Sequence, residues 1–329
     1  MTTTGPRPTT LVTGGCGFIG FALCRHLADA GHQVVAFDDL TRGNAGNLPE
    51  GARLVRADVR DANALAAALS DARPDGVIHL AAIHYLPDCA ARPDETRDVN
   101  IEGTRRVLEA CRAGGVRRVV FASSVAVYAR TDDPCSEEHT PLEPIEVYGE
   151  SKLEGERLVE AFGRDTGTAT TTVRLANAVG RRETNPHVVP HIFETLRRSH
   201  QVPLGNIEPR RDYIDTRDIA GAIVAALESS QGHRVFNVGT GVGHSVADII
   251  ALLARILGRP IEIQQDASRL RPVERMMLVA DIRRIREAIG WVPRLTLEYS
   301  LRDLVSAYGL NADRASDPAS AHPKSTPAP

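Results

Sequence analysis

The sequence of 329 residues has few cysteines, few aromatic residues and no long apolar run. Its five cysteines are odd in number and form no CxxC pair, which argues against a disulfide framework and indicates reduced thiols. No apolar stretch approaches the roughly 20 residues that a membrane-spanning helix needs, so no membrane partner is expected. The first ten residues, MTTTGPRPTT, lack the apolar segment of a secretory signal. These absences predict a cytoplasmic protein.

An excess of one charge is lacking as well. The 39 Lys and Arg residues nearly balance the 42 Asp and Glu residues, which leaves a formal net charge of −3. No basic face stands out, so no nucleic-acid partner is expected. Hydrophobic residues make up 42% and charged residues 25% of the chain, as is typical of a globular protein with one large or two modest domains.

The sequence does have a regular alternation of short apolar runs and helical segments. Strands are predicted at 10–14, 33–39, 52–59, 76–82 and 117–124, and helices at 18–31, 63–72, 94–113 and 148–164. The strands lack period-two alternation, which indicates a sheet with both faces covered. The predicted fold class is therefore α/β, with a Rossmann-like, doubly wound parallel sheet and right-handed crossovers.

The pattern changes after the strand in TTTVRLANAVG. It becomes irregular from about residue 177 and returns to the sheet at VFNVGTG (235–241). We predict a first domain formed by residues 1–176 plus about 212–241. Residues about 177–211 plus 242–311 would form a smaller C-terminal substrate-binding lobe. Residues 312–329 would form a disordered tail.

A glycine loop marks the first strand-to-helix turn. TGGCGFIG places Gly14, Gly17 and Gly20 in a GxxGxxG spacing, which lets backbone amides approach a pyrophosphate at a helix N-terminus. The alternative is an ordinary tight turn. The second strand ends in Asp38 and Asp39, about twenty residues further on, where carboxylates accept hydrogen bonds from ribose hydroxyls and repel a 2′-phosphate. This arrangement favours NAD over NADP.

Two nearby residues leave alternatives open. Arg42 lies past the two carboxylates, and its guanidinium could pair with a 2′-phosphate. Asp58 follows the third strand and suits either an adenine contact or the N-cap of the next helix.

A tyrosine and a lysine share one helical face further along. VYGESKLEGERL places Tyr148 and Lys152 four residues apart, which on a helix brings the side chains together. The alternative is a surface pair on an amphipathic helix. A tyrosine with a pKa near 10 is a poor base at pH 7. A neighbouring ammonium and a positively charged nicotinamide would both favour its phenolate.

The motifs together resemble those of a known family. TGGCGFIG, FDDLTRGN, VIHLAA, VVFASSVAVY, YGESK, RRDYIDTRDIA and FNVGTG run in order from residue 11 to about 241, and AIGWVP (288–293) extends the match. The chain is similar to the extended short-chain dehydrogenase/reductase family, in particular its NAD-dependent nucleotide-sugar epimerase/dehydratase branch. The resemblance implies bound NAD, a UDP-, dTDP- or GDP-linked sugar substrate, and a homodimer formed through helices 94–113 and 148–164.

The resemblance also assigns roles to the reacting residues and the cofactor site. Ser124 would hydrogen-bond the reacting hydroxyl, Tyr148 would act as acid and base, and Lys152 would hold the nicotinamide ribose. Asn100 would steady this helix region. The matching motifs add cofactor contacts at Phe18, Ile19, Leu40, Gly43, Val59, Leu80, Ala81 and Ala82.

Two further residues resemble family positions that contact the substrate diphosphate. They are Asn177 and Arg211, and a fixed guanidinium suits phosphate oxygens. A salt bridge from Arg211 to Asp212, Asp215 or Asp218 is the alternative, and Arg210 competes for the role.

The residues after Ser124 bear on the reaction. Dehydratases of this branch carry an acid pair there, as in TDEVYG, whereas this chain has Val125 and Ala126. Without that pair a 4,6-elimination lacks its acid and base. We therefore predict a 4-epimerase that acts through a transient 4-ketosugar, by hydride transfer to and from tightly bound NAD. The alternative is a 4,6-dehydratase or ketosugar reductase, because PLGNIEPRRDYID and RLRPVERMMLVAD resemble the dehydratases. The intact Ser124, Tyr148 and Lys152 argue against a nucleotide-sensing regulator.

Histidines raise two smaller questions. The loop IHYLPDCAARP departs from the branch, and its His84 would contact substrate as a second acid or base, or else be a hydrogen-bonded loop residue. His187 and His191 lie four apart, but Pro190 is expected to interrupt their helix, and no third ligand is visible. No metal site is predicted.

Overall fold

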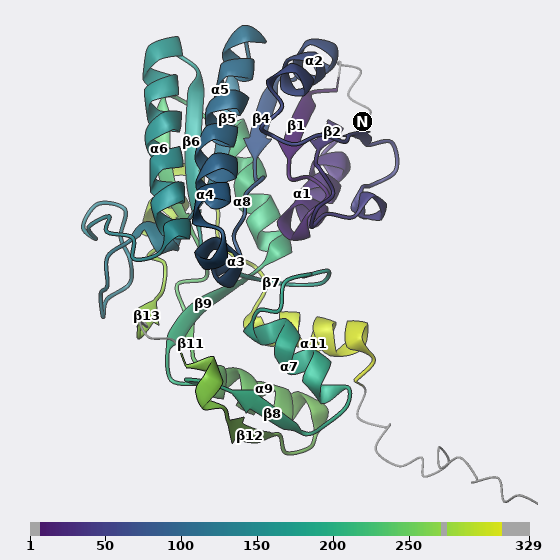
Figure 1. Cartoon of the computed structure of the whole chain (residues 1–329), viewed down its shortest axis with the longest axis vertical. Helices are drawn as coiled ribbons and strands as arrows, with labels where there is room; N and C mark the ends of the chain where they lie inside the picture. The colour runs from purple at the N-terminus through teal and green to yellow at the C-terminus, as the bar shows by residue number, and fades with distance from the viewer. Residues whose placement is uncertain (1–6, 271–274, 311–329) are drawn as a thin grey trace, which may run out of the picture.

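The structure, a computed structural model, describes residues 7–270 and 275–310. The predicted tail 312–329 lies outside these residues. Seven parallel strands form the central sheet in the order β10-β6-β5-β4-β1-β2-β3 (Figure 1). They are β1 (Thr9–Thr13), β2 (Gln33–Phe37), β3 (Arg53–Val55), β4 (Gly76–His79), β5 (Arg118–Ser124), β6 (Ala169–Leu175) and β10 (His233–Val238). The predicted doubly wound parallel sheet is confirmed, including the return of the chain at β10.

Helices cover both faces of this sheet. One face carries α1 (Phe18–Asp29), α8 (Thr216–Glu228) and α10 (Arg283–Ile289), and the other carries α2 (Ala62–Ala72), α5 (Gly103–Ala113) and α6 (Val147–Thr166). Each face has its own apolar core, which explains why the strands are apolar without alternation. Strand order reverses between β1 and β4, and a crevice at the carboxyl ends of the strands is expected at that point.

The predicted helix 94–113 is a continuous helical run with one widened turn. It consists of α4 (Pro93–Arg97), a π-helical segment (Asp98–Glu102) and α5, and the short α3 (Leu86–Ala91) precedes it. Asn100, at the centre of the π-helical segment, is 2% exposed. Its amide hydrogen-bonds the backbone N–H and C=O of Ile83 and the hydroxyl of Ser151. Asn100 therefore fixes the loop after β4 against α6.

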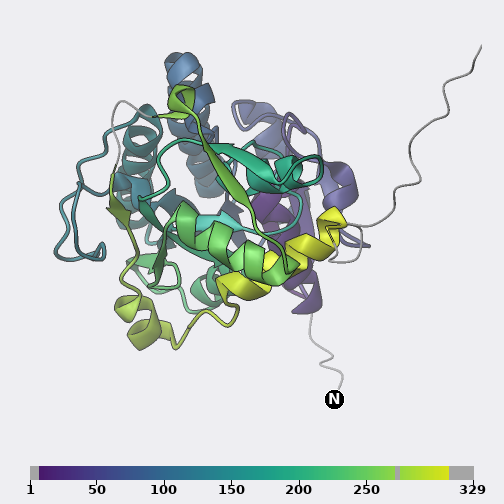
Figure 2. The same cartoon turned by 90° about the horizontal axis from the view of Figure 1, so that it is seen from below.

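A smaller lobe lies below the sheet in Figure 1 and has a separate apolar core. Its elements are β7 (Asn177–Val179), α7 (Val188–Leu196), β8 (Gln201–Leu204), β9 (Arg210–Asp215), β11 (Gly243–His244), α9 (Val246–Leu257), β12 (Glu262–Gln265), β13 (Met277–Leu278) and α11 (Leu297–Tyr308). Strand β9 pairs with β7, β11 and β13, and β8 pairs with β12. Seen from below, α9 and α11 lie in front of the rest of the chain (Figure 2). Ile285 of α10, which the predicted boundaries assign to this lobe, packs instead into the core of the sheet.

Three short 3₁₀ turns complete the described structure, at Ala45–Asn47, Val125–Val127 and Ala267–Arg269. Of the helices in the described ranges, none has the length and apolar character that a transmembrane span requires. All five cysteines of the sequence lie in these ranges and are buried and free.

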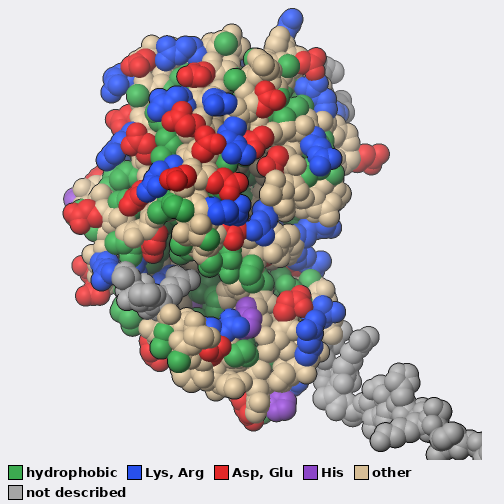
Figure 3. All heavy atoms as spheres, viewed as in Figure 1, with side chains coloured by type: hydrophobic (Ala, Val, Ile, Leu, Met, Phe, Trp, Pro, Cys, Tyr) green, Lys and Arg blue, Asp and Glu red, His purple; other side chains and the backbone are tan. Residues whose placement is uncertain are grey.

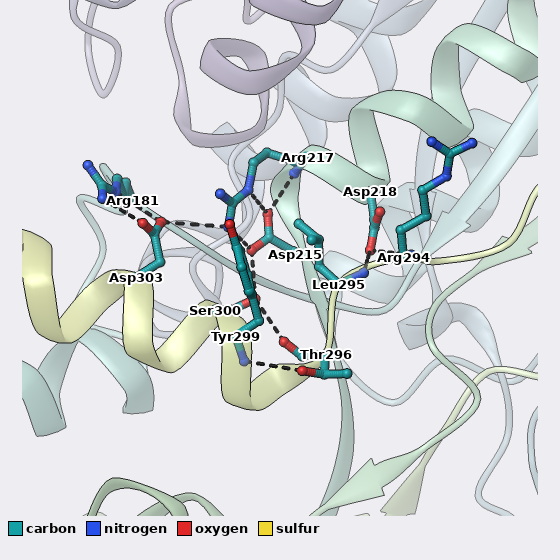
Figure 4. Close-up of polar contacts among 10 residues, drawn as sticks. All are labelled: Arg181, Asp215, Arg217, Asp218, Arg294, Leu295, Thr296, Tyr299, Ser300 and Asp303. Atoms are coloured by element: carbon teal, nitrogen blue, oxygen red, sulfur yellow. Dashed lines mark hydrogen bonds and ion pairs between the residues drawn. The ribbon is translucent and has the colours of Figure 1, made fainter. Parts of the chain in front are cut away.

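Buried acids join the two parts of the molecule (Figure 4). Asp215 begins α8 as its N-cap, pairs with Arg217 and accepts a hydrogen bond from Ser300 of α11 at 2.6 Å. Asp218 accepts the backbone N–H groups of Arg294 and Leu295. These contacts attach the C-terminal helix of the smaller lobe to a helix that covers the sheet.

Pro190 does not interrupt the helix at 188–196. It occupies the third position of α7, in the first turn, where a backbone N–H has no partner within the helix anyway. His187 is the N-cap, and His191 follows one turn later. The expected break is wrong because the helix starts only two residues before the proline.

Candidate active site

A cleft of about 730 Å³ lies between the carboxyl ends of the central strands and the smaller lobe. Figure 3 shows the surface hollowed between these two parts. Every predicted site residue lines this cleft except Leu40 and Asn100. Asn100 reaches the site indirectly, by positioning Ile83 and Ser151. The sequence motifs, spread over some two hundred residues, are thus gathered at one crevice.

The glycine loop is shaped for a close approach of backbone to a ligand. Gly14 has φ +71°, and a Cβ there would lie 2.9 Å from the backbone N of Ala81. A Cβ at Gly20 would lie 2.3 Å from the carbonyl oxygen of Gly14, so only glycine fits. Gly17 is the N-cap of α1 and supplies no side chain to cap the first turn. The amides of that turn, including those of Phe18 and Ile19, therefore suit a pyrophosphate.

The two carboxylates after β2 are held by backbone amides. Asp38 is 7% exposed and accepts the N–H groups of Cys16 and Leu40, at 2.9 and 2.8 Å. Asp39 accepts the N–H and the hydroxyl of Thr41. Burial raises the pKa of Asp38 from its usual range, while these backbone hydrogen bonds lower it. Asp38 thereby anchors the glycine loop to the end of β2.

Arg42 and Asp58 both have partners within the chain. Arg42 pairs with Asp88 in the first turn of α3. Asp58 binds the backbone N–H and the guanidinium of Arg60, and this contact lowers its pKa. The N-cap of α2 is Asp61, which accepts from the N–H of Ala64. The N-cap interpretation of Asp58 is therefore wrong, and its carboxylate faces the cleft.

The three candidate catalytic residues meet at the end of β5. Ser124 ends this strand, Tyr148 lies in the first turn of α6, and Lys152 lies one turn later. Nζ of Lys152 lies 6.0 Å from the centroid of the Tyr148 ring and donates to the carbonyl of Ala122 at 2.8 Å. Oγ of Ser124 accepts the backbone N–H of Ala126 at 3.2 Å, and Ser124 lies close enough to Tyr148 to lower the pKa of its hydroxyl. The arrangement can move a proton at a hydroxyl held between serine and tyrosine.

Burial opposes the charged forms of both titrating residues. It raises the pKa of Tyr148 to about 12, although the nearby Ser124 lowers it in part. It lowers the pKa of Lys152 to about 8. Without a bound cofactor, burial thus raises the pKa of Tyr148 by more than the expected effect of Lys152 would lower it. A phenolate at neutral pH needs the additional positive charge of a bound nicotinamide.

The hydroxyl of Ser123 belongs to a buried polar network, although the residue itself borders the cleft. Its hydroxyl donates to Glu156, which forms a bidentate salt bridge with Arg174. Arg174 donates to the hydroxyl of Tyr128 at 2.9 Å, and Tyr128 donates to Asn237 at 2.7 Å. The two adjacent serines therefore differ in surroundings: Ser123 is structural, whereas Ser124 faces the cleft.

The two residues at the positions of the dehydratase acid pair have apolar side chains in the folded structure. Val125 is 2% exposed, and neither Val125 nor Ala126 carries an ionisable group. The carbonyl of Ala126 instead accepts a hydrogen bond from Nη2 of Arg275 at 3.1 Å. Arg275 lines the cleft and is 5% exposed, and Nε and Nη1 have no hydrogen-bond partner within the described ranges. Arg275 lies in the stretch RLRPVERMMLVAD, but no spacing in that stretch singled it out as a site residue.

Asn177 and Arg211 line the part of the cleft formed by the smaller lobe. The three acids considered as partners of Arg211 bind other groups: Asp212 binds Thr240 and Gly241, Asp215 binds Arg217 and Ser300, and Asp218 binds two backbone amides. Arg210 reaches the carbonyl of Gly243 and lies outside the cleft lining. Arg211 donates to the carbonyl of Arg210 and, unlike Arg210, lines the cleft.

His84 meets residues from the smaller lobe that the sequence did not connect with it. Its Nε2 lies 3.0 Å from the amide nitrogen of Asn185. Its ring stacks on that of His187 with 6.0 Å between centroids. Glu183 and His187 each place a ligand-type atom within 4.8 Å of the other and of His84. His191, in contrast, bonds the carbonyl of Pro203.

Comparisons with known proteins agree with this geometry. Residues 10–239 match the model of the NAD dependent epimerase/dehydratase family. The chain is 31% identical to the UDP-glucose 4-epimerase of Corynebacterium glutamicum over 303 residues, which cover 87% of this chain and 91% of that protein.

Two solved structures are similar over almost their whole length. The UDP-glucose 4-epimerase of Thermotoga maritima, with UDP-glucose, has a TM-score of 0.85 and 30% identity and covers 92% of this chain and 98% of its own. The dTDP-glucose 4,6-dehydratase of Streptomyces venezuelae, with NAD, has a TM-score of 0.85 and 26% identity and covers 92% and 97%. The overall fold therefore does not distinguish an epimerase from a dehydratase. The distinction has to come from the residues of the cleft.

Proposed function

The chain belongs to the NAD dependent epimerase/dehydratase family, and from this premise we propose that it is an NAD-dependent 4-epimerase of a nucleotide-diphosphate hexose. The observation that carries the proposal is the pair Val125 and Ala126 beside an intact Ser124, Tyr148 and Lys152. The site retains the groups needed for oxidation at C4 and lacks those needed for elimination.

The cofactor site fits NAD on the chain's own geometry. The first turn of α1 would hold the pyrophosphate, Asp38 and Asp39 the adenosine ribose, and Lys152 the nicotinamide ribose. When bound, NAD⁺ supplies the hydride acceptor for the carbon that bears the reacting hydroxyl. Arg42 is paired with Asp88, so its guanidinium is not free to bind a 2′-phosphate.

The side chains of this site would carry the proton in both directions. Ser124 would hold the C4 hydroxyl toward Tyr148, and the phenolate of Tyr148 would remove its proton. After the 4-ketosugar turns over in the cleft, Tyr148 would return the proton to the new hydroxyl. Asn177 and Arg211 would hold the diphosphate meanwhile, which lets the hexose rotate while the nucleotide stays bound.

Incubation with UDP-glucose and NAD tests this function. We expect UDP-galactose, the C4 epimer, to accumulate toward equilibrium without any added reductant, as followed by NMR of the sugar signals. A 4-keto-6-deoxy product would instead identify a dehydratase. Net consumption of NADH with a ketosugar would identify a reductase. UDP-linked hexoses are the first choice because the similar epimerases named above carry that substrate in their names.

A homodimer through the helices at 94–113 and 148–164 and a cytoplasmic location stay predictions. The face that these helices present carries ion pairs such as Arg97–Glu150 and Arg157–Glu154. Sedimentation of the full chain at low and high salt would measure the assembly and the contribution of such charges.

Arg275 yields a prediction in which stability and binding change in opposite directions. Arg275 pairs with the partly exposed Glu146 at 3.7 Å, but within the described residues two nitrogens of its buried guanidinium have no hydrogen-bond partner, which is costly to the fold. An arginine in a cleft also favours an anionic substrate. We expect Arg275→Met to raise Tm by about 2–4 °C and to raise KM for the nucleotide sugar by about tenfold. Calorimetry and initial rates measure the two effects.

The matched control is Arg283→Met, which removes an exposed arginine paired with Asp281. We expect it to leave both Tm and KM nearly unchanged, since exposed ion pairs contribute little. An unchanged KM in Arg275→Met would show that this arginine does not meet the substrate.

A further inference from the structure

Three metal-ligating side chains from two parts of the chain meet at one side of the cleft. His84 follows β4, Glu183 lies in the loop after β7, and His187 is the N-cap of α7. One ligand atom from each lies within 4.8 Å of the other two. A tetrahedral ion with bonds of 2.0–2.2 Å holds its ligands roughly 3.4 Å apart, so small side-chain rotations bring the three into range.

His84 is oriented as a metal ligand. Its Nε2 lies 3.0 Å from Nδ2 of Asn185, and the backbone of Ala82 lies beside the ring. Because Nδ2 is a donor, Nε2 keeps its lone pair for an acceptor role. A tautomer fixed by neighbouring groups in this way is typical of metal-bound histidines. Tyr85 packs edge-on against His187 with 5.2 Å between centroids, which restrains the second imidazole.

Asn185 adds an independent indication of a missing ligand. The residue is 2% exposed, yet its Oδ1 has no hydrogen-bond partner within residues 7–270 and 275–310. A buried oxygen without a partner is costly, and a bound ion would remove that cost. As placed, Nδ2 is the amide atom that faces His84, so a half-turn of the amide would bring Oδ1 to that side and exchange the bond between Nδ2 and Nε2 for one to the ion. The backbone N–H of Asn185 also donates to Glu183 at 2.9 Å and so steadies that carboxylate.

We propose that His84, Glu183 and His187 bind a divalent cation of the zinc type, with Oδ1 of Asn185 as the fourth ligand. Two imidazoles and one carboxylate form a ligand set that zinc accepts in tetrahedral geometry. The site joins the loop after β4 to the N-terminus of α7, and it would close one side of the cleft. It is independent of the proposed epimerisation, whose groups lie at Ser124, Tyr148 and Lys152.

The charges around the cluster make Glu183 the decisive ligand. Lys152 and Arg42 act on His84 as positive charges and Asp88 acts as a negative one. Glu183 is the ligand that brings a negative charge to the ion. Glu183→Gln keeps the volume and removes this charge, so it should weaken binding without disturbing the fold.

Zinc binding to the full chain, first stripped with a chelator, tests the site. We expect one Zn²⁺ per chain by calorimetry and visible absorption bands of tetrahedral cobalt when Co²⁺ replaces it. Zinc at 100-fold above Kd should raise Tm by about 5 °C. Glu183→Gln and His187→Ala should each weaken binding at least about tenfold. Circular dichroism verifies that both variants are folded.

His191→Ala is the matched control, since His191 lies one turn further along α7 and bonds Pro203 instead. It should bind zinc as tightly as the parent chain. Absence of stoichiometric binding to the parent chain would overturn the proposal, as would equal losses in His187→Ala and His191→Ala. Neither result would affect the epimerase assay, which needs no added metal.

Discussion

Replacing Tyr148 by phenylalanine should lower kcat for epimerisation by about 10²- to 10⁴-fold, because the variant has no group to exchange the proton of the C4 hydroxyl. The hydroxyl is lost while the ring, the helix and Lys152 remain, so NAD should still copurify with the variant. Initial rates with UDP-glucose and the absorbance of cofactor released on denaturation measure the two properties. Loss of NAD together with turnover would mean that the fold, rather than the proton transfer, had failed.

Tyr128→Phe provides the control for this experiment. Tyr128 is fully buried and bonds Arg174 and Asn237, away from the reacting groups. Removing its hydroxyl should lower the free energy of unfolding by about 1–3 kcal/mol and leave kcat within a few-fold. Unchanged turnover in Tyr148→Phe, or a larger loss in Tyr128→Phe, would contradict the assignment of the acid and base.

Replacing Lys152 by methionine should lower kcat by about 10²-fold and reduce the NAD retained through purification. The variant loses the positive charge that favours the Tyr148 phenolate and the donor proposed for the nicotinamide ribose. Of the 39 Lys and Arg residues only two are lysine, Lys152 and Lys324, so the structure describes a single lysine. All other basic side chains of Lys or Arg type in the described residues are arginines. The single lysine there is the candidate catalytic residue.

The same substitution should make the cofactor-free chain more stable near neutral pH. Burial lowers the pKa of Lys152 to about 8, below its ordinary value of 10.5, so the unfolded chain holds this proton more tightly. Stability of the parent chain therefore rises as pH increases from about 8 to 10.5, while Lys152→Met lacks this gain. The advantage of the variant should shrink over that range in denaturant titrations. A constant difference would show that Lys152 titrates normally.

Much of the fold could be predicted because each strand and helix has a local signal. Apolar runs and helical spacing predicted the strands and helices of a doubly wound parallel sheet, and the glycine motif predicted where the cofactor would bind. The π-helical turn at Asn100 could not be predicted, because it depends on hydrogen bonds to Ile83 and Ser151 that only the folded chain brings together. Helix α7 was misjudged from Pro190, since a proline signal depends on where the helix begins.

The site was predicted as far as it follows motifs. Asp58 was open to two interpretations because two acids, Asp58 and Asp61, precede the same helix, and only the structure shows that Asp61 caps it. Arg275 and the cluster of His84, Glu183 and His187 escaped notice for another reason. Their partners lie about 100 or more residues away in sequence, and single side chains without a spacing pattern give no local signal.

The different surroundings of Ser123 and Ser124 bear on the cost of the chemical step. Ser123 is bonded to Glu156, and Glu156 is bonded to Arg174, so the end of β5 is fixed to both α6 and β6. The backbone of Ser124, one residue further along the same strand, is held by these bonds, and its hydroxyl accepts the N–H of Ala126 at 3.2 Å. The polar groups at this end of β5 therefore need little rearrangement when the reaction begins. In water the solvent dipoles would have to reorient, and that reorganisation costs free energy.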